Sequence, residues 1–244
     1  MEPTSTVLSK CVPSLQSDRF IRLHIGTGDD AFSVQLPQSL LEATSEYFRK
    51  ALGGNRFVEG MSGEIHLEED DVESWKTLLD WLTHRKVPDV VGCTTMEEDF
   101  IAMSKCWLLG DKYHLRGFQN DAMIQLITYA DHMGCEFGPA DYKYLVPLCP
   151  PDSVLMMFLA EEAAWRLKEL ERPLSDYNAL DGTIGFWPAL FKPVELLKEN
   201  GEYICGRLKG VEKRTDGTYA HWRKYMVGDL PQIVNVLKDK PRCG

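Results

Sequence analysis

The stretch Asp111-Lys112-Tyr113-His114-Leu115-Arg116-Gly117-Phe118-Gln119-Asn120 connects two segments whose apolar residues recur with helical spacing. We place a turn at Leu115-Arg116-Gly117. The apolar stripes on its two sides are Phe100, Met103, Trp107 and Gly110 before it, and Phe118, Ala122, Leu126, Ala130 and Met133 after it. This spacing predicts two amphipathic helices joined by a short turn.

Upstream of that stretch, the alternation of apolar and polar residues predicts three strands. Phe20–Ile25 and Phe32–Leu36 both alternate, and the turn residues 26–30 between them favour a hairpin. Glu64–Glu68 has the same period and predicts the third strand. Between the hairpin and the third strand, apolar residues at helical spacing predict one helix that begins near Pro37 and ends at Gly53-Gly54.

The rest of the chain has mainly helical patterns. Asp70 or Asp71 can cap a helix, and its expected stripe is Val72, Trp75, Leu78, Leu79 and Leu82. Residues 141–151 predict a linker or a short helix. Val154–Glu171 begins apolar nearly all round, so we expect it to be buried on more than one side and to end before Pro173. Beyond it, we expect a short helical pair broken by Pro188 and Pro193.

These elements predict an α+β fold in which a helical cluster is capped by a small three-stranded sheet and followed by a mainly helical C-terminal extension. We divide the chain into a flexible arm (1–17), an α+β domain (18–135), a helical extension (141–200) and a basic segment of uncertain fold (201–244). The last segment holds nine basic and five acidic side chains, whereas the whole chain has a net charge of −10.

Composition and charge exclude several classes of protein. A net charge of −10 disfavours binding to nucleic-acid phosphates. We find no apolar run long enough to span a bilayer, and Met1–Lys10 lacks the pattern of a secretory signal. The seven cysteines are scattered without metal-binding or redox spacing, which favours reduced thiols in a cytoplasmic or nuclear protein.

No motif for catalysis, cofactor binding or metal binding stands out. Gly26 and Gly28 lack the third glycine of a dinucleotide-binding loop, so we interpret them as hairpin residues. The acidic run 68–71 lacks calcium-site spacing and is interpreted as a solvated helix start. The six histidines are widely separated in the sequence, and none pairs with a cysteine at zinc spacing. The sequence therefore predicts no enzyme, although an enzyme of unrecognised type stays as an alternative.

Taken in order, several segments resemble the BTB/POZ domain, a protein-interaction fold, over about residues 18–133. The resemblance also extends to fungal proteins that have one such domain followed by helices. Its motifs are Leu41-Glu42-Ala43-Thr44-Ser45-Glu46-Tyr47-Phe48, Phe57-Val58-Glu59, Ile65-His66-Leu67, Leu78-Leu79-Asp80-Trp81-Leu82-Thr83 and the Asp111-Lys112-Tyr113 run. The resemblance implies protein partners, with self-association or partner binding as the function, and it leaves a homodimer and a monomer both open.

Within this resemblance, Phe57 and Glu59 are the candidate site residues. In adaptors of this family the apolar residue and the acid contact the cullin scaffold of a ubiquitin ligase, which makes a substrate adaptor the alternative function. The opposing interpretation is that Phe57 covers the domain core and Glu59 faces solvent. The charged pocket of corepressor-binding members would have its acid at Asp18, but its basic position holds Thr44, which argues against that ligand.

Overall fold

The computed structural model describes residues 18–53, 57–88, 95–132, 139–169, 173–192 and 222–228. Within them lies a three-stranded sheet of β1 (Phe20–Ile25), β2 (Phe32–Pro37) and β3 (Glu64–Leu67), in the order β2-β1-β3. β1 pairs antiparallel with β2 and parallel with β3. All three predicted strands are confirmed, with β2 one residue longer and β3 one residue shorter than expected. The predicted arm, residues 1–17, lies outside the described residues.

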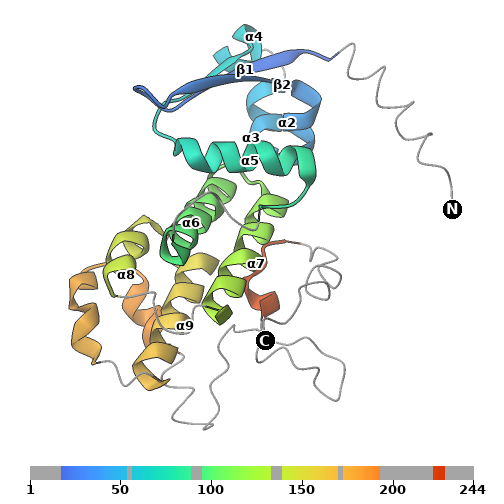
Figure 1. Cartoon of the computed structure of the whole chain (residues 1–244). Coiled ribbons are helices and arrows are strands. Elements are labelled where there is room, and N and C mark those ends of the chain that lie inside the picture. The colour runs from blue at the N-terminus through green and yellow to red at the C-terminus, as the bar shows by residue number, and fades with distance from the viewer. Residues whose placement is uncertain are drawn as a thin grey trace, which may run out of the picture.

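The sheet has one apolar and one polar face, as the alternation predicts. Ile21, Leu23, Ile25 and Ile65 are buried, whereas the residues between them point to the opposite face. Figure 1 shows the sheet at one end of the molecule, with α2, α3 and α5 beneath it. Gly26 ends β1 with a positive φ of 71°, and a Cβ atom there would lie 2.4 Å from Cγ2 of Val72. A side chain at this hairpin position would therefore push the sheet away from α5.

The single helix predicted between Pro37 and Gly53 is wrong, because two helices fill this region. They are α2 (Gln38–Thr44) and α3 (Glu46–Leu52), separated by Ser45 in an extended conformation. The Ser45 hydroxyl accepts a hydrogen bond from Phe48 N at 3.1 Å and donates one to the Tyr113 carbonyl at 2.5 Å. Ser45 therefore acts as the N-cap of α3. It also connects the break between α2 and α3 to the Asp111–Asn120 stretch through its hydrogen bond to Tyr113.

Two helices flank β3. The short helix α4 (Val58–Ser62) precedes it, and α5 (Val72–His84) follows it with Asp71 as N-cap. The Asp71 carboxylate accepts a hydrogen bond from Ser74 N at 2.9 Å, which confirms the predicted acidic cap. Trp75 and Leu78 are buried as expected, but the buried face also includes Ser74, Thr77 and Trp81.

The two helices predicted on either side of the turn in the Asp111–Asn120 stretch are confirmed as α6 (Met96–Lys112) and α7 (Arg116–His132). The turn is displaced from its predicted place: it lies at Tyr113–Leu115, with His114 at a φ of 53°, and Gly117 is already helical. Gly110 allows α6 and α7 to approach, because a Cβ atom there would lie 2.9 Å from Cβ of Gln119. The last residue of the predicted stripe, Met133, lies outside the described residues.

The remaining described segments are helical and complete an α+β fold. They are α8 (Pro139–Leu145), η1 (Val146–Leu148), α9 (Val154–Glu169), η2 (Leu174–Leu180), a helix over 186–192 and η4 (Trp222–Tyr225). The segment 141–151 is thus a short helix with a 3-10 turn, and Pro188 lies inside a helix where we expected a break. The rest of that expected pair, and most of the segment 201–244, lie outside the described residues. None of the described helices is long and apolar enough to cross a membrane.

Helix α9 is buried on more than one side, as its apolar sequence predicts. Its buried residues include the polar Glu161, Glu162 and Arg166 as well as Leu155, Met156, Phe158, Leu159, Ala160, Ala163 and Ala164. η4 packs against both α9 and α7 (Figure 1). We call the sheet with α2–α5 the sheet end, and the helices from α6 onward the helical end. The buried apolar residues of the two ends form one continuous cluster.

Candidate functional site

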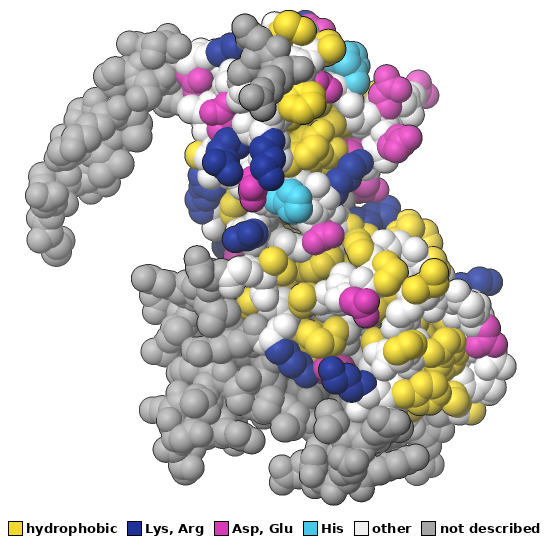
Figure 2. All heavy atoms as spheres, turned by 180° about the vertical axis from the view of Figure 1, so that it is seen from behind, with side chains coloured by type: hydrophobic (Ala, Val, Ile, Leu, Met, Phe, Trp, Pro, Cys, Tyr) yellow, Lys and Arg dark blue, Asp and Glu magenta, His cyan; other side chains and the backbone are white. Residues whose placement is uncertain are grey.

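Helix α4 carries a group of exposed apolar side chains beside the sheet. Phe57, at its N-cap position, is 52% exposed, Val58 is 70% exposed and Met61 is 59% exposed. We call these three residues the α4 surface. Hydrophobic side chains at the surface of both the sheet end and the helical end are visible in Figure 2. Exposed apolar residues of this size gathered on one short helix are suited to contact a protein.

The position of α4 is fixed by its neighbours and not by its length, since five residues form barely more than one helical turn. The guanidinium of Arg19, just before β1, donates to the Gly60 carbonyl at 2.5 Å and to the Met61 carbonyl at 3.0 Å. At its end, Gly63 adopts a left-handed conformation with φ 77° and leads directly into β3. The α4 surface is therefore held by two anchors, one next to the start of β1 and one next to the start of β3.

The predicted site residues Phe57 and Glu59 lie on this helix, two residues apart. Phe57 is half exposed and is not among the buried core residues of the described chain. Glu59 lies in the first turn of α4 and is half-buried. A carboxylate in a first helical turn interacts favourably with the helix dipole.

Asp18 and Thr44, which correspond to the charged pocket of the resemblance, are both engaged inside the fold. Asp18 accepts hydrogen bonds from the Ser39 backbone N–H at 3.2 Å and from the Ser39 hydroxyl. Asp18 thereby gives a hydrogen-bond partner to a backbone N–H group in the first turn of α2, which has none within the helix. The Thr44 hydroxyl donates to the Leu40 carbonyl at 2.8 Å.

The acidic run before α5 is solvated at Glu68 and Glu69, as expected, and Asp71 caps the helix. Asp70 departs from this expectation. The Asp70 carboxylate is buried and accepts hydrogen bonds from Trp75 Nε1 at 2.8 Å, the Tyr113 hydroxyl at 2.6 Å and Lys112 Nζ at 2.6 Å. Lys112 and Tyr113 belong to the Asp111–Asn120 stretch. A buried carboxylate needs such partners, and here it ties the turn between α6 and α7 to the start of α5.

Beside Asp70 lies an open hollow of about 370 Å³ between α5, α6 and the α8–η1 segment. Asp71 and Lys105 form an ion pair across it at 2.9 Å, and Tyr144 and Leu148 line its other side. Burial opposes the ionised form of Asp71, but the hydrogen bonds from Lys105 and Ser74 hold its pKa below the ordinary value. Burial likewise opposes the charged form of Lys105, but the hydrogen bond to Asp71 and its negative charge hold the pKa of Lys105 above the ordinary value.

The two described cysteines, Cys106 and Cys149, are buried free thiols. Burial raises the pKa of each thiol to about 12. A thiol is a nucleophile only when it is deprotonated, so both are inert at neutral pH and serve as core residues.

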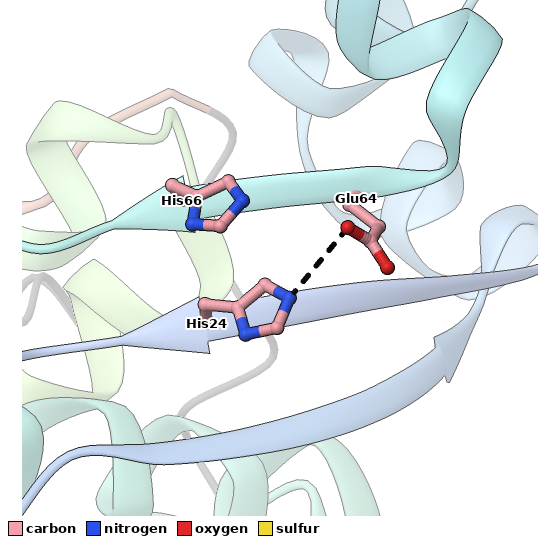
Figure 3. A group of neighbouring side chains, drawn as sticks. All are labelled: His24, Glu64 and His66. Carbon is pink, nitrogen blue, oxygen red and sulfur yellow. Dashed lines mark ion pairs between the residues drawn. The ribbon is translucent and has the colours of Figure 1, made fainter.

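The outer face of the sheet brings together two histidines that the sequence analysis treated as separate. His24 on β1 and His66 on β3 stack with ring centroids 4.5 Å apart and ring planes 8° apart. Glu64 Oε2 lies 4.0 Å from His24 Nε2, and Figure 3 shows the three side chains on the same face. The alternation of β1 and β3 placed these residues on polar faces, but it carried no signal that the two strands are neighbours.

Comparisons with known proteins add no relative to this description. The chain matches no model of a protein family and no curated protein sequence.

Proposed function

We propose that the chain is a protein–protein interaction module of the BTB/POZ type, and that the α4 surface is its docking site. The observation that carries the proposal is the exposure of Phe57, Val58 and Met61 on a helix that the sheet holds in place. Exposed apolar side chains that gather in one patch mark protein interaction sites, and a few well-placed anchors supply most of the binding energy of an interface.

The order of elements supports this type of module. The resemblance expects a hairpin, a helix with the Leu-x-x-x-Ser-x-x-Phe pattern, a third strand, an acid-capped helix and the Asp-Lys-Tyr segment. The described elements follow this order, except that the pattern spans two short helices, α2 and α3, in place of one. The motif residues also have roles in packing. Ser45 caps α3, Phe48 is buried, and Lys112 and Tyr113 bind the Asp70 carboxylate.

The proposal is tested by removing the apolar side chains of α4 from the full-length chain. Affinity purification with mass spectrometry should recover partners with the parent that are lost with the Phe57→Ala/Met61→Ala double variant. Ile184→Ala is the matched control, because Ile184 is 75% exposed and lies in the helical end. An identical set of proteins recovered by the parent and by the double variant would contradict docking through α4.

Self-association is distinguished from binding of another protein by sedimentation velocity of the purified chain. A concentration-dependent dimer that the double variant shifts to monomer would identify a second copy as the occupant of the α4 surface. Symmetric dimers are the commonest assemblies of this kind. A monomer at all concentrations leaves another protein as the occupant.

A second candidate function, substrate adaptor of a cullin-based ubiquitin ligase, is favoured by the placement of Phe57 and Glu59. Phe57 is half exposed at the N-cap position of α4, and Glu59 lies in the first turn of the same helix. An aromatic anchor accompanied by an acid is the arrangement that the resemblance assigns to cullin contact. For this arrangement to bind, the partner must offer an apolar pocket for Phe57 and a basic side chain for Glu59 beside that pocket.

The adaptor function is tested with a purified cullin scaffold. Phe57→Ala should weaken binding more than about tenfold, as expected for the loss of an interface anchor. Glu59→Gln should weaken it less and should reduce its dependence on salt. Equal recovery of the cullin by the parent and by Phe57→Ala would remove this function without affecting docking of other partners.

A further inference from the structure

We propose that the outer face of the sheet binds one divalent transition-metal ion through His24, Glu64 and His66. One donor atom from each of the three side chains can be chosen so that all lie within 4.8 Å of one another. This site is separate from the α4 surface, and the proposal does not depend on the proposed function.

Strand pairing places the three donors. In the parallel pair of β1 and β3, His24 lies directly opposite His66, and Arg22 lies opposite Glu64. His24, Glu64 and His66 therefore share one face, because side chains two residues apart on a strand point the same way. The register is fixed by the buried residues Leu23, Ile25, Ile65 and Leu67 on the opposite face. A rigid sheet thus presents the donors at fixed backbone positions.

The imidazole of His24 already has the environment of a metal ligand. Its Nδ1 atom is hydrogen-bonded to the Ser33 hydroxyl on β2 at 2.9 Å, which orients the ring. Its Nε2 atom is shielded from solvent and has no hydrogen-bond partner among the described residues. A second hydrogen bond on the non-ligating nitrogen is the usual support of a metal-bound histidine. A metal ion would satisfy the Nε2 atom.

The donor set selects the class of ion. Two imidazole nitrogens and one carboxylate suit Zn²⁺, Cu²⁺, Ni²⁺ or Co²⁺, whereas Ca²⁺ and Mg²⁺ require oxygen ligands. Three protein ligands leave a fourth position open to water or to a group from another molecule. The exposure of His66 and Glu64 gives an ion access from solvent.

Binding requires the stacked rings to move. Tetrahedral coordination at bond lengths of about 2.0–2.1 Å places ligand atoms roughly 3.3 Å apart, closer than the present donors. The rings are nearly parallel, so their lone pairs do not converge on one point. We therefore expect the ion to turn at least the exposed His66 ring out of the stack. The backbone does not have to move.

Arg22 competes with the ion for Glu64, since its guanidinium lies 3.7 Å from Glu64 Oε1. Its positive charge also repels a divalent cation. Arg22→Gln should therefore tighten metal binding, which a merely structural role of the cluster does not predict.

The test is titration of the full-length, untagged chain with Zn²⁺ by calorimetry, together with Co²⁺ absorption spectra. We expect a site that binds one equivalent and gives visible Co²⁺ bands without the intense ultraviolet bands of thiolate ligands. His66→Ala and Glu64→Gln should each weaken it at least about tenfold, and Arg22→Gln should strengthen it.

His84→Ala is the matched control, because His84 is an exposed histidine on α5 beside Asp80 and should leave the affinity unchanged. Thermal unfolding of each variant without metal verifies that the fold is retained. The proposal is overturned if the parent and the His24→Ala/His66→Ala double variant bind Zn²⁺ equally, or if the parent binds none. Thiolate bands in the Co²⁺ spectrum that survive in the double variant would assign the metal to cysteines instead.

Discussion

At the residue scale, the Asp70 carboxylate joins parts of the chain that are far apart in sequence. It accepts hydrogen bonds from Trp75 in the first turn of α5, from Lys112 at the end of α6 and from Tyr113 just after α6. The Tyr113 ring also stacks on Phe48 of α3, with centroids 5.4 Å apart. Helices α3, α5 and α6 therefore meet at the side chains of Asp70 and Tyr113. Deleting one partner leaves a buried charge with fewer hydrogen bonds, which is costly.

Tyr113→Phe should lower the free energy of unfolding by about 2 kcal/mol at neutral pH, as expected for a lost hydrogen bond to a charged group. Burial first, and then the hydrogen bond to Asp70 and its negative charge, raise the pKa of Tyr113 above its ordinary value of 10.0. Below pH 10 the Tyr113 hydroxyl keeps its proton in both the folded and the unfolded chain, so its hydrogen bond contributes fully to the free energy of unfolding. Above it the unfolded chain ionises first, and the contribution falls.

Urea unfolding of the parent and of Tyr113→Phe at neutral pH and above pH 10 measures both effects, and the difference between them should narrow at the higher pH. Tyr47→Phe is the control, because Tyr47 packs edge-on against Tyr113 and is 39% exposed. If Tyr47→Phe costs as much as Tyr113→Phe, the hydrogen bond to Asp70 is not the cause.

At the element scale, the break between α2 and α3 depends on one hydroxyl. Ser45 is 2% exposed, accepts a hydrogen bond from Phe48 N as the cap of α3, and donates one to the Tyr113 carbonyl. Helices this short are not stable alone, so tertiary contacts must hold them.

Ser45→Ala should destabilise the chain by about 1–2 kcal/mol, since it removes an N-cap and leaves a buried carbonyl without its donor. Thr83→Ala serves for comparison, because the Thr83 hydroxyl makes an exposed bond to its own helix at 3.1 Å. That change should cost well below 1 kcal/mol. Chemical unfolding of the two variants gives the comparison, and equal costs would refute the assigned role of Ser45.

This break also shows what the local pattern of the sequence could and could not predict. The strands and the stripes of α6 and α7 were predictable because a period of two or of 3.6 residues repeats within each segment. Ser45 interrupts no such period: the apolar spacing from Leu41 to Phe48 suits one helix as well as two. The decisive contact is the Tyr113 carbonyl, which lies far along the chain. Phe57 and Glu59 were chosen as candidate residues from the resemblance. Their placement at the start of a separate short helix was not predicted.

At the scale of the whole molecule, a short C-terminal segment returns to the core. The Asn120 side chain of α7 donates to the Val227 carbonyl at 3.0 Å and accepts from Val227 N at 2.7 Å. Tyr225 is fully buried, and its hydroxyl, together with Lys224, bonds to Glu161 of α9. The sequence could not predict this contact, nor the pairing of His24 with His66, because neither leaves a periodic signal within one segment.

Asn120→Ala should release the segment 222–228 and cost about 1–3 kcal/mol, because both backbone groups of Val227 lose their partner. Limited trypsin digestion followed by mass spectrometry should show faster cleavage after Lys224 in this variant than in the parent. Asn178→Ala changes an exposed asparagine in η2 and should leave the digestion rate unchanged. Identical cleavage of all three proteins would show that Asn120 does not hold the segment.

The return of Val227 to Asn120 has a consequence for biosynthesis. The two residues are 107 positions apart, so α7 and α9 leave the ribosome well before the strip that covers them exists. The surfaces of α7 and α9 that contact η4 lack this cover until residues 222–225 have been synthesised. A stop codon between the codons for Glu169 and Trp222 would therefore give a product in which α7 and α9 have no η4 to pack against.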